Sequence, residues 1–77
     1  MTDEELRQHI EINPAVLLGK PVIRDTRLSG EFVVRLVAQG IPNEEILEQY
    51  PRLQPDDIKA ALMYAARVLA NEEIFLS

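Results

Sequence analysis

The chain has 77 residues, no cysteine and a formal net charge of −5. We expect a chain of this length to form one small domain over residues 1–77 that buries only about 60% of its unfolded surface. Without cysteine, neither disulfides nor cysteine-based metal sites add stability. Association with another chain is therefore the leading way to stabilise the fold. No segment approaches the roughly 20 apolar residues of a membrane span, and residues 1–9 are acidic, unlike a secretory signal, so we expect a cytoplasmic protein without membrane contact.

Two short elements are predicted near the N-terminus. The run Thr2-Asp3-Glu4-Glu5 has the pattern of a capping box, with Thr2 as N-cap, and predicts a short helix over residues 3–8. Polar and apolar residues alternate at positions 9–12, which suits a half-buried strand that ends at Asn13-Pro14. Residues 22–23 offer a second extended piece to pair with this strand.

The segment Gly19–Arg27, which we call the basic loop, combines turn-forming residues with cations. Gly19 accepts a positive φ, and Pro21 keeps the residue before it out of the helical region, so we predict a shaped loop or a short extended piece. Residues 19–40 carry four basic and two acidic residues, whereas the segments on either side are acidic. The four cations are candidate contacts to nucleic acid or to a partner, with simple solvation as the alternative: Lys20, Arg24, Arg27 and Arg35.

Three helices are predicted after this loop. The first begins after Ser29, whose hydroxyl can cap the free amides, and ends at Gly40. A second covers about residues 43–50, and a third has Pro55 in the favoured first position and runs to about residue 70. The shorter helix, the tight turn and the longer helix form a helix-turn-helix pattern. We therefore expect a mainly α fold, a small helix-turn-helix-like three-helix domain with a short N-terminal extended arm or β-hairpin.

The third helix is apolar on more than one face. Its expected core stripe consists of Ile58, Ala61, Leu62, Ala65, Val68 and Leu69. Four further residues leave much of the remaining circumference apolar: Ala60, Met63, Tyr64 and Ala66. Because a surface helix is rarely apolar on both sides, we expect another chain to cover the second side, in a homodimer or with an obligate heteromeric partner. The helix residues assigned to this interface are Ala60, Met63, Tyr64 and Arg67.

An apolar tail follows the third helix. Ile74, Phe75 and Leu76 come directly after Glu72-Glu73, beyond the expected end of the helix. The tail either folds back over the core of its own chain or docks into a groove on a partner. In the second case its three large side chains belong to the same interface as the residues assigned on the third helix.

The sequence contains no catalytic constellation. The pair Gly19-Lys20 does not belong to a phosphate-binding loop, because Pro14 and Pro21 stand where that loop needs Gly and Ser or Thr. The single histidine, His9, lacks a cysteine or a second histidine for a metal site and is expected to be an ordinary surface or strand residue. Adjacent acidic residues such as Asp56-Asp57 are explained by the favourable interaction of carboxylates with the positive end of a helix dipole, so they do not indicate an acid–base pair or a metal site. We expect a protein that is not an enzyme, with no cofactor, metal or small-molecule substrate.

Several motifs give the chain a family resemblance. They lie in the basic loop and in the helices after it: Gly19-Lys20-Pro21-Val22-Ile23-Arg24, Thr26-Arg27-Leu28, Glu45-Ile46-Leu47 and Tyr50-Pro51. Over about residues 12–66 the chain resembles the domain of unknown function 433 family, and residues 67–77 form the helix end and apolar tail beyond this core. Two positions depart from the family pattern, Asp25 where Gly is usual and Pro42 where a capping Ser is common. Asp tolerates a left-handed turn, so we expect the loop to keep its shape.

The resemblance implies an antitoxin-like helix-turn-helix protein encoded beside a PIN-like nuclease toxin, and we expect the chain to neutralise such a toxin. Binding to DNA for autoregulation is a further expectation from the same resemblance. Asp56 and Asp57 stand in the first turn of the third helix and repel phosphates, so any contact with DNA falls to the basic residues of segment 19–40. The alternative is a dimeric protein-protein interaction or adaptor module without DNA binding.

Overall fold

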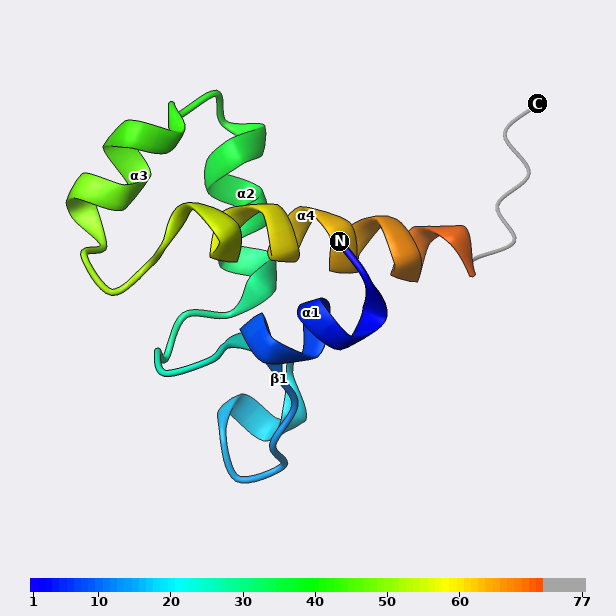
Figure 1. The fold of residues 1–77 in the computed structure, drawn as a ribbon. Coiled ribbons are helices and arrows are strands. Elements are labelled where there is room, and N and C mark those ends of the chain that lie inside the picture. The colour runs from blue at the N-terminus through cyan, green and yellow to red at the C-terminus, as the bar shows by residue number, and fades with distance from the viewer. Residues whose placement is uncertain (72–77) are drawn as a thin grey trace.

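The computed structural model of the protein describes residues 1–71, and the tail residues Ile74, Phe75 and Leu76 lie outside this range. The described chain is mainly helical with one short β-hairpin, which confirms the expected fold class. Its elements are α1 (Asp3–His9), β1 (Ile10–Glu11), a 3₁₀ turn (Leu17–Gly19), β2 (Val22–Ile23), α2 (Gly30–Ala38), α3 (Asn43–Gln49) and α4 (Pro55–Ala70). In Figure 1, α4 runs through the middle of the fold, α2 crosses it, and α3 and the hairpin lie on opposite sides. No helix within residues 1–71 is both long and apolar enough to cross a membrane.

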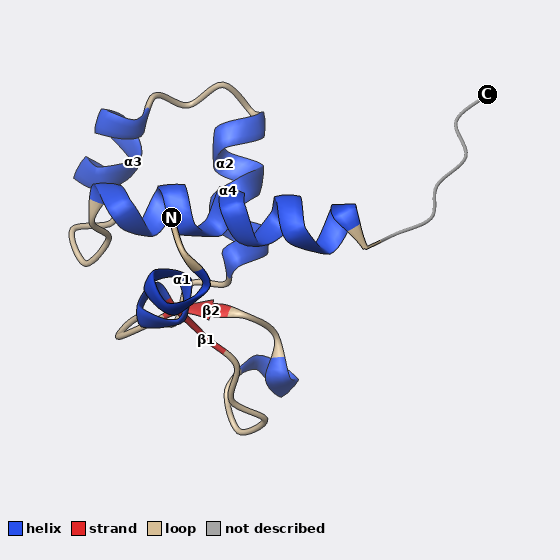
Figure 2. Cartoon of the chain, turned by 45° about the vertical axis from the view of Figure 1, so that its right-hand side comes forward, coloured by secondary structure: helices blue, strands red, loops and turns tan. Residues whose placement is uncertain are grey.

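The N-terminal helix and the hairpin form as the sequence predicts. Thr2 Oγ1 accepts a hydrogen bond from the Glu5 backbone N–H at 3.2 Å, so the capping box is present, and α1 extends one residue further than expected, to His9. Strands β1 and β2 pair antiparallel, with Ile10 opposite Ile23 (Figure 2). The hairpin therefore brings the basic loop, which contains β2, next to the end of α1.

The loop between the strands contains left-handed backbone at residues that rarely adopt it. Leu17 and Leu18 have φ angles of 48° and 56°, and Gly19 follows with 82°. The side chain of Leu18 is 97% exposed, so no packing compensates for the strain, which is roughly 1–2 kcal/mol for a residue with a Cβ. After β2, Asp25 has a φ of 66°, which confirms that this residue keeps the left-handed turn.

The three later helices begin and end where the sequence predicts. At the start of α2, Ser29 Oγ accepts a hydrogen bond from the Phe32 N–H at 3.0 Å, and Gly40, with a φ of 83°, ends the helix. The residue before α3, Pro42, makes no side-chain cap, and α4 begins at Pro55. The short α3, its turn and the longer α4 make up the helix-turn-helix-like body.

The core lies where α4 meets the other elements. Its largest fully buried side chains are Val22, Ile23, Val33, Ile46 and Ile58. They come from β2, α2, α3 and α4, and all of them except Val22 form one cluster with Leu6 of α1 and Ile10 of β1. The N-terminal helix is therefore part of the domain core.

The two sides of α4 differ from the prediction. Ala60, assigned from the sequence to an interface with another chain, is fully buried inside the domain, so this assignment is wrong. Leu62, Val68 and Leu69 were expected in the core stripe, yet they are 40%, 44% and 60% exposed. The physical reason is that α1 packs along the face of α4 that carries residues 57, 60, 64 and 67, while the C-terminal half of α4 extends past α2 and α3 (Figure 1).

Candidate partner-binding site

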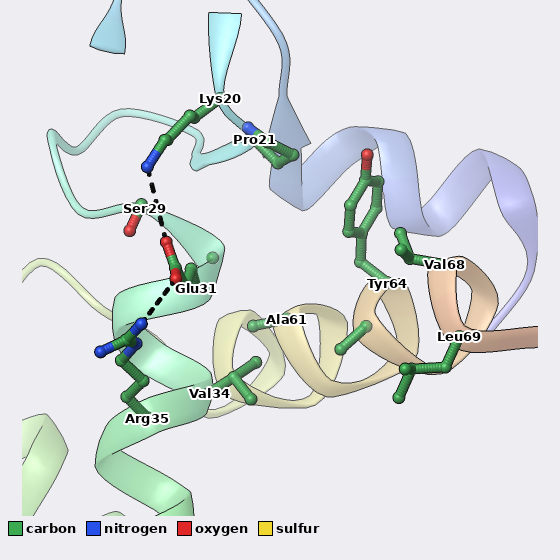
Figure 3. Close-up of a pocket in the computed structure, with 12 residues that line it drawn as sticks. Lys20, Pro21, Ser29, Glu31, Val34, Arg35, Ala61, Tyr64, Val68 and Leu69 are labelled. Carbon is green, nitrogen blue, oxygen red and sulfur yellow. Dashed lines mark hydrogen bonds and ion pairs between the residues drawn. The ribbon is translucent and has the colours of Figure 1, made fainter. Parts of the chain in front are cut away.

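An apolar groove of about 580 Å³ lies between α2 and α4, and we call it the α2–α4 groove (Figure 3). Val34 of α2 lies opposite the α4 residues that form the second wall. The remaining lining residues are Lys20, Pro21, Ser29, Gly30, Glu31 and Arg35 at one end, and Ala61, Tyr64, Ala65, Val68 and Leu69 along α4. Because most of this surface is hydrocarbon, an apolar side chain from another molecule gains free energy by leaving water there.

One end of the α2–α4 groove carries three charges in contact. Glu31 accepts a hydrogen bond from Arg35 Nη2 at 2.9 Å, and its other carboxylate oxygen lies 3.6 Å from Lys20 Nζ. The hydrogen bond and charge of Arg35, with a smaller effect of the Lys20 charge, lower the pKa of the Glu31 carboxyl below its ordinary value. All three side chains are exposed, so these ion pairs add little to stability. Two cations and one carboxylate leave this end of the groove with a positive excess.

The predicted interface residues of α4 divide between the groove and the region under α1. Tyr64 lies between the α2–α4 groove and a second hollow of about 290 Å³, which α1 and β1 form with α4. Arg67 lines this second hollow and pairs with Asp3 of α1. Met63 is half-buried and packs against the core. Of the interface residues predicted on α4, Tyr64 is therefore the one that lines the groove.

The four predicted contact cations do not form one basic surface. Lys20 and Arg35 share the carboxylate of Glu31 at the groove. Arg24 is next to a different carboxylate, with Nη1 3.9 Å from a carboxylate oxygen of Glu11. Three of the four predicted cations are therefore next to carboxylates of their own chain, which weakens their attraction for a polyanion.

Arg27 lies elsewhere, beside Arg52, which is not one of the four predicted contact cations. It lines a polar hollow with Arg52, Asp25 and Thr26, and within residues 1–71 neither arginine has an ion-pair partner. Arg52 belongs to the turn between α3 and α4. The helix-turn-helix pattern could have identified it, because this turn lies next to the start of the second helix.

The first turn of α4 is held by a contact with α1. Asp57 is 7% exposed, and its carboxylate accepts one hydrogen bond from the Gln54 backbone N–H and one from His9 Nδ1, both at 2.8 Å. The expectation that His9 is an ordinary surface or strand residue is wrong, because it joins the end of α1 to the start of α4 across 48 positions of sequence. Asp56 is the exposed carboxylate of this turn.

The α2–α4 groove offers an apolar binding surface. Within residues 1–71, no group of three or more acidic or histidine side chains is arranged to hold a metal ion. The charged side chains at the groove are engaged with one another through Glu31, and its walls are aliphatic apart from Tyr64. This arrangement suits the burial of apolar side chains from a second molecule, with a charged contact at one end.

Comparison with known proteins gives consistent matches. The family model described as "Protein of unknown function (DUF433)" matches residues 10–65. The uncharacterized protein y4eO of Sinorhizobium fredii (strain NBRC 101917 / NGR234) is 37% identical over 59 residues, which cover 77% of this chain and 27% of that protein. The crystal structure of a DUF433 member protein from Anabaena variabilis ATCC 29413 is similar with a TM-score of 0.76 and 34% identity, covering 87% of this chain and 66% of that chain. The chain thus spans about a quarter of the curated relative that it matches.

Proposed function

This chain belongs to the DUF433 family, and we propose that it is a non-enzymatic, antitoxin-like helix-turn-helix protein that neutralises a PIN-like nuclease toxin by binding it in the cytoplasm. The observation that carries this proposal is the α2–α4 groove, an apolar surface on a small domain, with Val68 and Leu69 exposed along its α4 wall. Contiguous apolar surface of this kind is typical of protein-protein contact sites. An amphipathic helix or an extended apolar segment of the toxin would fit there.

The charge of the protein supports a nuclease as the partner. Three glutamates of α3 and one aspartate of α4 are exposed, close in sequence to the helix-turn-helix turn: Glu44, Glu45, Glu48 and Asp56. A nuclease holds RNA with cations, and an acidic surface attracts the same cations. The apolar groove would then supply affinity, while the acidic surface would increase the rate of encounter and favour a basic partner.

Purification from the native host tests this proposal. We expect a small nuclease to elute with the protein, and we expect the purified protein to inhibit RNA cleavage by that nuclease at about equimolar concentration. Recovery of the homodimer alone, or cleavage that the protein leaves unchanged, would contradict the antitoxin-like role.

Two neighbouring alanines of α4 provide a matched pair of variants. Ala65 lines the α2–α4 groove, whereas Ala66 is exposed on the same helix outside the groove. Ala65→Arg should reduce inhibition of the nuclease because the larger, charged side chain fills the groove, and Ala66→Arg should leave inhibition unchanged. Equal effects of the two variants would show that the groove is not the contact site.

The second candidate function is a dimeric interaction or adaptor module without DNA binding. It is favoured by the positions of Lys20, Arg24 and Arg35, each next to a carboxylate of the same chain. DNA binding for autoregulation stays part of the proposal only through Arg27 and Arg52. A duplex that binds with salt-dependent affinity would support the autoregulatory role, and no binding at low salt would favour the adaptor.

A further inference from the structure

The apolar tail that follows α4 has the same two parts as the α2–α4 groove. In the tail, Glu72-Glu73 precedes three large apolar residues at 74–76. In the groove, the cations Lys20 and Arg35 lie at one end, and apolar side chains of α2 and α4 extend from there towards Leu69 (Figure 3). An acidic pair followed by an apolar triplet therefore matches the groove in the order of its charges and its hydrocarbon surface.

The length of the tail also matches the groove. The α4 wall runs from Ala61 to Leu69, which is about 12 Å at the rise of an α-helix. Five residues in extended conformation span about 17 Å at most. Residues 72–76 can therefore lie along the whole wall, and a groove of about 580 Å³ is large enough for apolar side chains of this size.

The charged end of the groove can accept further carboxylates. Glu31 is the carboxylate that pairs with both Lys20 and Arg35, and all three side chains are exposed. A lysine ammonium has three donors and an arginine guanidinium has five, so most of the donors at this end are left for other acceptors. The pair Glu72-Glu73 supplies two acceptors of the required charge.

The direction of the chain distinguishes the tail of the same molecule from that of a second molecule. α4 ends at Ala70, directly after Leu69, at the apolar end of the groove. A tail that turned back on its own helix would bring Glu72-Glu73 to this apolar end and its apolar triplet towards the cations. A tail from another copy enters without this restriction and can place its acidic pair at the cations.

We propose that the α2–α4 groove of each molecule receives residues 72–76 of a second copy of this chain. Two copies that exchange tails in this way form a closed dimer in which each contact occurs twice. This inference rests on the binding role proposed for the groove and identifies its occupant in the absence of a nuclease.

Two charge-reversed variants test the exchange. The first, Lys20→Glu with Arg35→Glu, has a reversed groove and a natural tail, and the second, Glu72→Lys with Glu73→Lys, has a natural groove and a reversed tail. Alone, each variant places like charges together at both contacts, so we expect the dissociation constant of its dimer to rise at least about tenfold above that of the natural chain. Mixed in equal amounts, the two variants match at both contacts, and we expect a heterodimer close to the natural dimer in affinity. Sedimentation velocity measures all of these states.

The control is Arg52→Glu with Lys59→Glu, which changes the net charge as much as the first variant but at exposed sites outside the groove. We expect its dimer to be unchanged, and a loss equal to that of the groove variant would overturn the proposal. A natural chain that stays monomeric at micromolar concentration, variants that dimerise normally alone, or a mixture that gains no affinity would each overturn it as well. Inhibition of the nuclease is measured separately, so its failure with intact tail exchange refutes the proposed function alone.

Discussion

Asp57 determines how strongly the start of α4 is held in the domain. Its carboxylate accepts hydrogen bonds from the Gln54 N–H and from His9 Nδ1, both at 2.8 Å. Asp57→Ala removes the helix cap, at about 1 kcal/mol, and leaves the half-buried His9 without its partner, at about 1–2 kcal/mol more. We therefore expect the free energy of unfolding to fall by about 2–3 kcal/mol, which lowers the melting temperature of a domain this small by about 10–20 °C.

Thermal and urea unfolding, followed by far-UV circular dichroism, measure this loss against a neighbouring control. Asp56→Ala removes the same charge from the same helix turn, but Asp56 is exposed, so only the interaction with the helix dipole is lost, at up to about 1 kcal/mol. Equal destabilisation by the two variants would refute the role assigned to the hydrogen bonds of Asp57. His9→Ala should cost little further stability in the Asp57→Ala background, and additive losses would show that the two side chains are not coupled.

Three further predictions concern exposed residues. Leu18→Gly should raise the free energy of unfolding by up to about 1 kcal/mol, because it relieves a left-handed φ of 56° without loss of packing, and chemical denaturation would show it. Because the folded state lowers the pKa of Glu31, Glu31→Gln should destabilise the protein fully above the ordinary pKa of 4.5 and no longer once the pH has fallen through the lowered value; urea titrations across acidic pH test this. Arg27→Ala with Arg52→Ala should reduce binding to a DNA duplex more than Arg35→Ala does, and anisotropy titrations at two salt concentrations that show equal effects would contradict this.

Local signals in the sequence predicted most of the secondary structure correctly. Thr2 and Ser29 cap helices through hydrogen bonds to amides three residues ahead, a contact that depends on sequence spacing alone. Gly40 ends α2 and Asp25 adopts a left-handed turn because few other residues tolerate a positive φ. Pro55 begins α4 for a similar reason, since its fixed φ suits the first position of a helix.

The parts that the sequence did not predict depend on contacts between distant segments. Helical periodicity showed that α4 is apolar on two sides, but it could not show that α1 covers the side of Ala60 and leaves Leu69 exposed. The hydrogen bond between His9 and Asp57 joins residues whose order in the chain gives no sign of contact. Leu18 adopts a left-handed φ against its own preference, so a reading based on residue propensities could not identify it.

The same distinction between local and long-range contacts applies to the candidate site. Composition predicted an apolar surface on the longest helix, and Tyr64, which the sequence assigns to an interface with another chain, lines the α2–α4 groove. The groove itself also needs the basic loop and α2, whose position against α4 no local pattern specifies. Lys20 and Arg35 are candidate contacts to nucleic acid or to a partner in the sequence, and the fold places both next to Glu31.

The attachment of α1 to both ends of α4 has a consequence for the order of folding. Asp3 pairs with Arg67 and His9 bonds to Asp57, so α1 is fixed by residues from the opposite end of the chain, whereas α3 and α4 are neighbours in sequence. Closing a long loop costs more conformational entropy than closing a short one, so we expect α2, α3 and α4 to assemble first and α1 to dock last. In the native state, undocking of α1 is the local unfolding step with the lowest free-energy cost. The amide hydrogens of α1 should therefore exchange with solvent while the rest of the domain stays folded.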